Sequence, residues 1–234
     1  MMLRLIKKSN YYCFFLDDKI LKTPLNNEIQ ISVKKIAIRL GKYLELCINS
    51  KNKEKKFFLE ILYFCYDLNH ANKDVFLKEM TDNLNTDLLC YRANKKYELD
   101  EIQKKMWDPL LFFVKQKYKL SFKIVNSVMP VEQDSKNIVK LKNILKSLDN
   151  QKFSAYYFIN NFTNSNIIAL NFLANNIKSN YVWDCLSLED NYSLKKWGND
   201  KEAQNKLLEK KKYFDEIVNF NLLLNNLEMK NDRK

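Results

Sequence analysis

From residue 36 onward, apolar side chains recur at intervals of three and four residues along most of the chain. This spacing places them on one face of an α-helix and predicts helices over residues 36–48, 57–68, 73–85, 136–148, 152–161 and 207–224. The first 33 residues differ, because residues 11–16 and 20–24 flank an Asp-rich turn and residues 28–33 alternate, which predicts a β-hairpin and a third strand. The expected fold class is α+β, with a small N-terminal β-containing domain followed by a larger all-α orthogonal helical bundle.

A polar, charged segment at residues 49–56 separates the first predicted helix from the second. Linkers between domains have this composition, so we place a domain boundary there. The predicted domains are residues 1–52, a strand-rich domain with one helix, and residues 53–234, a helical domain.

Glycine is nearly absent, and this excludes several kinds of nucleotide site. With only Gly41 and Gly198 among 234 residues, the chain cannot build a phosphate-binding loop or the glycine-rich turn of a dinucleotide-binding fold. A single histidine, His70, and five cysteines without a CxxC pair argue against a zinc site and a Ser-His-Asp triad. We therefore predict no catalytic residue, no metal and no cofactor, although the pairing of carboxylates in space is not visible in a sequence.

The chain is strongly basic, with 40 lysine and arginine residues against 28 aspartate and glutamate residues and a formal net charge of +12. The lysines form short clusters spread along the sequence, whereas nucleic-acid sites concentrate basic residues on one face and favour arginine. A solvated surface therefore explains the charge better than an acidic protein partner or a nucleic acid, and both of these stay open. The apolar runs are far shorter than a membrane span, so we expect no membrane partner.

Residues 86–111 contain a helix-start signal inside an apolar pattern. Apolar spacing predicts a short helix over residues 98–107, and Asp108-Pro109 supplies the residue types preferred at a helix N-cap and first position. Trp107 would then fill a bend between two helices.

Arg92 is one of four arginines in a chain with 36 lysines. Where lysine is so strongly preferred, an arginine indicates that the planar guanidinium itself is needed, for example to bind Asp87, Asp108 or a backbone carbonyl. We interpret Arg92 as an internal clamp, with direct contact to a partner as the alternative.

The sequence near the C-terminus predicts a tight corner between two helices. Residues 181–197 have a helical pattern, and Gly198 follows them where a helix end favours positive φ. Asn199 and Glu202 then match the Asn-x-x-Glu pattern of a capping box.

Three blocks of this sequence are similar, in order and spacing, to a known family. They are Leu16-Asp17 to Thr23-Pro24; residues 87–93 with Gln103 and residues 107–111; and Tyr192 and Trp197-Gly198 with Asp200, Glu202 and Ala203. Together they resemble the signature of the ATP-twelve family, whose members are assembly chaperones for the α subunit of the F₁ sector of F-type ATP synthase.

The resemblance implies a molecular chaperone without enzymatic activity, which binds the unassembled α subunit and promotes assembly of the catalytic head. Glu189 and Asp190 match an acidic pair that the family uses for α-subunit binding, and Tyr192 and Trp197 complete the expected partner-binding site. Ser193 stands where the family has a glutamine. Without the resemblance, the acidic pair would be interpreted as solvated carboxylates on a helix surface.

The residues expected to support this site are Asp87, Arg92, Trp107, Asp108, Pro109 and Gly198. We expect a monomer that binds its partner transiently in a bacterial cytoplasm, because the N-terminal residues lead directly toward a predicted strand and leave no room for a leader. The mitochondrial matrix is the alternative location if a transit peptide is missing from this chain. The alternative function is that of a basic helical nucleic-acid-associated protein, which rests on charge alone.

Overall fold

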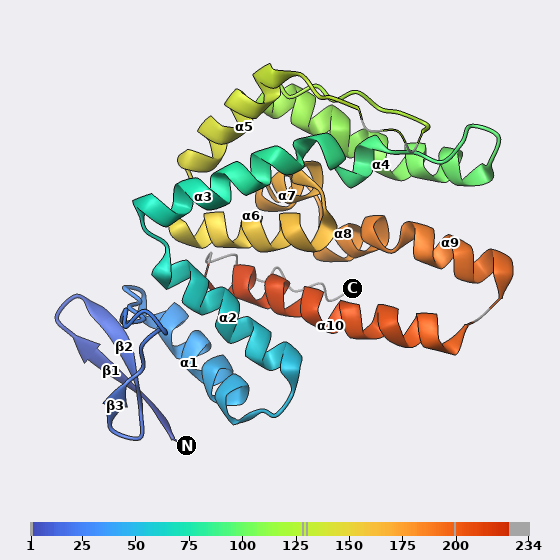
Figure 1. Cartoon of the computed structure of the whole chain (residues 1–234). Coiled ribbons are helices and arrows are strands. Elements are labelled where there is room, and N and C mark those ends of the chain that lie inside the picture. The colour runs from blue at the N-terminus through green and yellow to red at the C-terminus, as the bar shows by residue number, and fades with distance from the viewer. Residues whose placement is uncertain (1, 128, 130, 199, 225–234) are drawn as a thin grey trace. The chain divides into compact units, whose positions relative to one another are not determined.

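The computed structural model describes residues 2–127, 129, 131–198 and 200–224 (Figure 1). The chain divides into two compact units, each made of segments that are separate in sequence. Unit 1 comprises Met1–Asn69, Asp149–Ala155 and Asp215–Lys234, and unit 2 comprises His70–Leu148 and Tyr156–Phe214. The sequence predicts two domains that are each continuous, with one boundary at residue 52. The two compact units are instead built from alternating segments, so they do not test that boundary, which stays a prediction.

Unit 1 begins with an antiparallel sheet in the order β1-β2-β3, formed by β1 (Leu3–Lys8), β2 (Tyr11–Leu16) and β3 (Lys19–Ile20). The turn from β2 to β3 places Asp17 and Asp18 at φ values of 46° and 68°. Two successive residues with positive φ match the right-handed twist of a hairpin, and aspartate tolerates that conformation better than most residues. The predicted hairpin is confirmed.

The prediction of a third strand over residues 28–33 is wrong, and β1 occupies a segment for which no strand is expected. All of β1 pairs with one edge of β2. On the other edge of β2, only the two residues of β3 pair before the chain turns away. It returns only at Ile31, whose backbone exchanges hydrogen bonds of 2.8 and 2.9 Å with Tyr12. The alternation of apolar residues over 28–33 still identified which side chains face the core, because Ile29 and Ile31 are buried.

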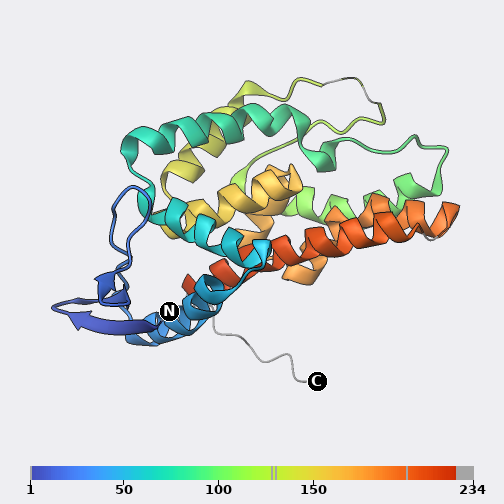
Figure 2. The same cartoon turned by 60° about the horizontal axis from the view of Figure 1, so that its bottom comes forward.

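The sheet packs against α1 (Lys34–Asn49), which in turn packs against α2 (Lys53–Asp67) (Figures 1 and 2). A Cβ atom at Gly41 would lie 3.2 Å from Cε1 of Phe14, so glycine lets α1 approach β2 closely. The fully buried side chains that make this core include Phe14, Leu40, Leu44, Phe58 and Phe220.

Unit 2 is helical. It contains α3 (His70–Asp82), η1 (Asn83–Thr86), η2 (Leu88–Cys90), α4 (Glu98–Tyr118), α5 (Ser135–Lys146), α7 (Asn166–Leu173), α8 (Ser179–Leu186) and α9 (Leu188–Trp197). The helices α6 (Asn150–Thr163) and α10 (Lys201–Leu224) each contribute residues to both units. Within unit 2, α3 packs against α5, and α4 packs against α7 and α9.

A small N-terminal sheet followed by helices makes the fold α+β, as predicted. The orthogonal crossing of the helices stays a prediction. In the part of the chain that the structure describes, no helix combines the length and the apolar character needed to cross a membrane.

The helix α4 runs without interruption through Pro109, so the predicted helix end at residue 107, helix start at Asp108 and bend at Trp107 are wrong. Its buried face continues on both sides of the proline and consists of Asp100, Gln103, Trp107, Leu110 and Val114. Burial of this continuous face outweighs the backbone hydrogen bond that Pro109 cannot donate. The local start signal is thus overridden by packing.

Replacing Pro109 by alanine is expected to stabilise the protein. Pro109 is exposed, and alanine would restore the missing backbone hydrogen bond and remove a steric clash inside the helix, which raises the unfolding free energy by roughly 1–3 kcal/mol. Urea denaturation monitored by circular dichroism measures the change. Lys105→Ala, at another exposed position of α4, reports the effect of helix propensity alone. A less stable Pro109→Ala protein would show that the proline itself sets the geometry of α4.

Candidate partner-binding site

Asp87 joins two segments of unit 2 that are distant in sequence. Its Oδ1 atom accepts hydrogen bonds from the backbone N–H of Leu89 (3.1 Å) and from Oγ of Ser165 (2.7 Å), and its Oδ2 atom accepts one from the N–H of Ile167 (3.1 Å). The carboxylate therefore caps η2 and the N-terminus of α7 together. Burial raises the pKa of Asp87 to about 6, although these hydrogen bonds oppose the increase.

Arg92 is held inside unit 2 by three kinds of contact. Its Nε atom donates to the backbone oxygen of Leu89 (2.8 Å), and its Nη2 atom donates to Oδ1 of Asp108 (2.9 Å). The guanidinium also lies over the fully buried ring of Trp107, 5.0 Å from the ring centroid. Arg92 is thus an internal clamp, and Asp108, predicted as a helix cap, is its ion-pair partner from the middle of α4.

Gln103 connects this interior to the surface of α9. Its Oε1 atom accepts a hydrogen bond from the backbone N–H of Ala93 (2.8 Å), and its Nε2 atom donates to Oε1 of Glu189 (2.7 Å). Because Gln103 is fully buried, the carboxylate of Glu189 is anchored at a defined position. Burial raises the pKa of Glu189, and the hydrogen bond from Gln103 works against that increase.

The predicted single helix over residues 181–197 is wrong, because α8 ends at Leu186 and α9 begins at Leu188. The backbone N–H and the hydroxyl of Ser187 both donate to the oxygen of Trp183, at 2.9 and 2.8 Å. The hydroxyl bond competes with the regular helical ladder and accompanies the break. Glu189 and Asp190 consequently lie in the first turn of a new helix, where negative charge interacts favourably with the helix dipole.

The four predicted partner-binding residues all lie on α9 but do not form one patch. Glu189 and Asp190 are exposed, and Trp197, at the end of the helix, exposes 75% of its surface. Tyr192 lines a groove between α4 and α9, whereas Asp190 and Trp197 line a smaller groove of about 410 Å³ with the first turns of α10. Tyr192 and Trp197 thus line different grooves, and the partner-binding role of the four residues stays a prediction.

Gly198 ends α9 with a φ of 100°, and a positive φ is what the sequence predicts at this position. The predicted capping role of Asn199 lies outside the described residues. The next helix has a cap at Asp200, whose Oδ1 atom accepts a hydrogen bond from the N–H of Glu202 (2.8 Å). At the corner between the two helices, α9 thus ends at a glycine and α10 begins with an aspartate cap.

The described residues contain no group of three or more His, Cys, Asp or Glu side chains placed to hold a metal ion. The side chain of His70 lies outside the described residues. All five cysteines are buried and free.

Tyr97 and Lys196 are the functional candidates that sequence reasoning missed. Nζ of Lys196 lies 5.7 Å from the ring centroid of Tyr97, 5.6 Å from that of Tyr192 and 5.5 Å from that of Trp197. Tyr97 exposes 58% of its surface just before α4. No sequence spacing links it to α9, because the two segments meet only in the folded unit.

Comparisons with known proteins find a matching family model for the N-terminal half of the chain and matching folds for almost all of it. Residues 4–115 match the family model described as ATP12 chaperone protein. Atp12 from Paracoccus denitrificans and a point mutant of that protein each match with a TM-score of 0.80 and 20% sequence identity, over 95% of this chain and 96% of theirs. Atu1473, a proposed chaperone from Agrobacterium tumefaciens, matches with a TM-score of 0.81 and 21% identity, over 93% of this chain and 82% of that one.

The fold, a small N-terminal sheet followed by helices, is thus the fold of the Atp12 structures. The resemblance to the ATP12 chaperone family is confirmed, since the family model covers both the hairpin and the segment that holds Asp87, Arg92 and Gln103. This family resemblance supports a chaperone role for the chain.

We predict that Asp87→Asn destabilises the protein. An amide cannot accept hydrogen bonds with both of its polar atoms, so one of the buried donors loses its acceptor, which costs about 1–3 kcal/mol of unfolding free energy. Urea denaturation of both proteins at neutral pH measures the loss. An unchanged midpoint would show that the carboxylate is not required to join η2 to α7.

The loss caused by Asp87→Asn is also expected to depend on pH. The pKa of Asp87 in the folded protein, about 6, is above the ordinary value of 3.8, so between these values the folded state binds more protons than the unfolded state. Asp87 therefore contributes stability on the acid side that is lost as the pH rises through about 6, and asparagine does not titrate. The difference between the two proteins should be larger near pH ~4.5 than near pH ~7.5. A constant difference would contradict the raised pKa.

Proposed function

We propose that this protein is a chaperone that binds the unassembled α subunit of the F₁ sector and promotes assembly of the ATP synthase head, without catalysis or a bound cofactor. The observation that carries the proposal is the anchoring of Glu189. Its carboxylate reaches the surface of α9 while Gln103 holds it at 2.7 Å, so a charged group is presented in a fixed orientation. Fixed charges at a surface favour recognition of a specific partner over general solvation.

Exposed aromatic side chains at the far end of α9 and just before α4 have the chemistry of a protein interface. Trp197 and Tyr97 expose 75% and 58% of their surfaces, and large aromatic residues are among the strongest contributors to binding energy at interfaces. Asp190 adds a second carboxylate in the same helical turn. We infer that the acidic pair binds basic residues of the α subunit and that the aromatic side chains lose their exposure on binding.

Such a chaperone acts by temporarily covering the exposed interface of the unassembled subunit. A subunit destined for a ring exposes an apolar patch that would otherwise self-associate, and a partner that binds only the free subunit shifts the equilibrium away from aggregation. Moderate affinity is sufficient, because the proper neighbouring subunit must be able to displace the chaperone.

Reversing the charge of the acidic pair tests the proposal. The double variant Glu189→Lys, Asp190→Lys replaces attraction by repulsion, and we expect binding of purified α subunit to weaken by at least about tenfold. Biolayer interferometry with immobilised chaperone, at two salt concentrations, measures the affinity. The conservative variant Glu189→Gln, Asp190→Asn keeps an acceptor for Gln103 and is expected to give an intermediate loss.

Glu60→Lys, Asp82→Lys is a matched control, because it makes the same change in net charge at exposed positions of α2 and α3. Circular dichroism and denaturation curves establish that each variant is folded. Equal binding by the α9 variant and the control would remove the acidic pair from the interface. If the unchanged protein does not bind the α subunit at all, the proposed client is wrong.

A further inference from the structure

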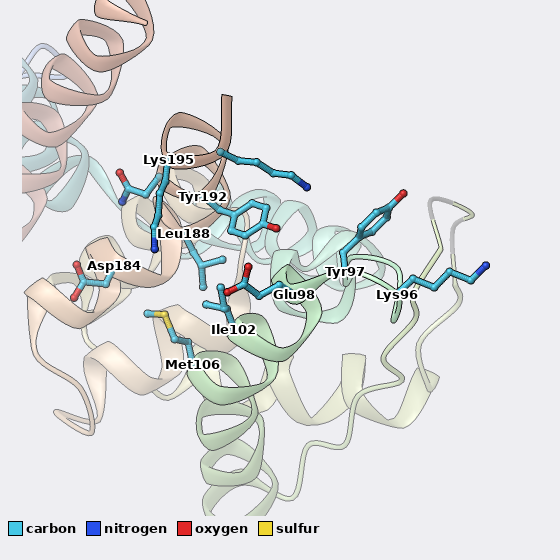
Figure 3. A pocket seen from close by; sticks show the side chains of 11 residues that line it. Lys96, Tyr97, Glu98, Ile102, Met106, Asp184, Leu188, Tyr192 and Lys195 are labelled. Atoms are coloured by element: carbon cyan, nitrogen blue, oxygen red, sulfur yellow. The ribbon is translucent and has the colours of Figure 1, made fainter. Parts of the chain in front are cut away.

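A groove of about 800 Å³ lies between α4 and α9 in unit 2 (Figure 3). We call it the α4–α9 groove. Its apolar lining consists of Ile102 and Met106 from α4 and Leu188 with the ring of Tyr192 from α9. The volume falls within the roughly 300–1,000 Å³ of typical binding sites, so the groove can receive several side chains of a partner.

The lining residues are spaced as one face of each helix. Ile102 and Met106 are four residues apart on α4, and Leu188, Tyr192 and Lys195 are separated by four and three residues on α9. Residues at these intervals form ridges along a helix, and two neighbouring ridges leave a channel into which a third helix can pack. The shape therefore suits an amphipathic helix better than a compact small molecule.

Two of the three lysines that line the groove lie at one end of it, and the third, Lys195, lies on the side of Asp184 (Figure 3). Lys96 and Tyr97 lie together at the end where α4 begins, away from Met106 and Asp184 (Figure 3). Lys196 is held at the same end, because its ammonium lies 5.7 Å from the ring centroid of Tyr97. An acidic side chain arriving here would meet the ammonium of Lys196, which the ring of Tyr97 already holds in place, while the side chain of Lys96 extends away from the groove (Figure 3).

The groove also contains two carboxylates, which limit where acidic groups can bind. Asp184 lies at the opposite end on the side of Lys195, and Glu98 lies near Ile102 (Figure 3). An occupant with carboxylates along its whole length would be repelled by Glu98 and Asp184. The charges thus fit a segment that is acidic at one end only.

We propose that the α4–α9 groove binds an amphipathic helical segment of the client, with apolar side chains on Ile102, Met106 and Leu188 and one or more carboxylates at the Lys96–Lys196 end. This inference rests on the proposed chaperone function, because it assigns the groove to the same client. A second copy of the chain fits less well, since two molecules with a net charge of +12 repel each other. The client would then meet two patches of opposite chemistry, the acidic pair and the basic end of the groove.

Two synthetic peptides of about 16 residues test the groove directly. Both carry the same apolar residues at helical spacing, but one ends in two glutamates and the other in two lysines. We expect the unchanged protein to bind the acidic peptide about tenfold more tightly, measured by fluorescence anisotropy. Lys96→Glu, Lys196→Glu should abolish or reverse this preference, and Ile102→Gln should weaken binding of both peptides.

Lys35→Glu, Lys51→Glu is the matched control, because it makes the same charge change at exposed positions of unit 1. Its preference for the acidic peptide should stay intact. Equal binding of the two peptides by the unchanged protein, or the same loss in the control as in the groove variant, overturns the proposal.

Competition with the α subunit separates this inference from the proposed function. Displacement of the acidic peptide by the unlabelled α subunit supports the assignment of the groove to the client. An α subunit that binds without displacing the peptide overturns that assignment and leaves the chaperone function standing. If the α subunit does not bind at all, the chaperone function fails, and the peptide comparison decides on the groove by itself.

Discussion

The buried carboxylate of Asp87 determines how the segment that follows it is placed. It caps η2 and α7 at once, so the chain that leaves η2 has a defined direction. Arg92 can then reach the carbonyl of Leu89 and the ring of Trp107. Burying a carboxylate is costly, as its raised pKa indicates, and the donated hydrogen bonds offset part of that cost. Both oxygens of Asp87 accept hydrogen bonds, and a buried group that is satisfied in this way specifies one arrangement of a core.

The same segment fixes the surface of α9 through Gln103. The backbone of Ala93 and the carboxylate of Glu189 are both bound by this one buried amide. A change near Asp87 would therefore alter the orientation of Glu189 without touching it. Hydrogen bonds thus connect the interior residues of this segment directly to the surface of α9.

Sequence patterns predicted which segments form helices better than they predicted the residues at which those helices begin and end. The three- and four-residue spacing identified most of the helices, because burial of one face supplies most of the stability of a helix in a protein. Pro109 and Ser187 show the limit. A strong local start signal at residues 108–109 was overridden by the continuous buried face of α4. The break at Ser187 is accompanied by a hydroxyl contact that no spacing reveals. β1 was missed because pairing with β2, rather than its own alternation, holds it in the sheet.

The predicted site came from resemblance, and packing explains what the resemblance could not supply. Glu189 and Asp190 are an ordinary pair of adjacent carboxylates in the sequence, and only the fold brings Tyr97 and Lys96 next to α9. The helix therefore presents carboxylates in its first turn and a lysine among aromatic rings near its end. A partner must match both signs of charge at the right distance to bind both patches, and a wrong partner meets repulsion at one of them. Such opposed charges give selectivity at moderate affinity, and this agrees with the proposed function, in which the chaperone must release its client.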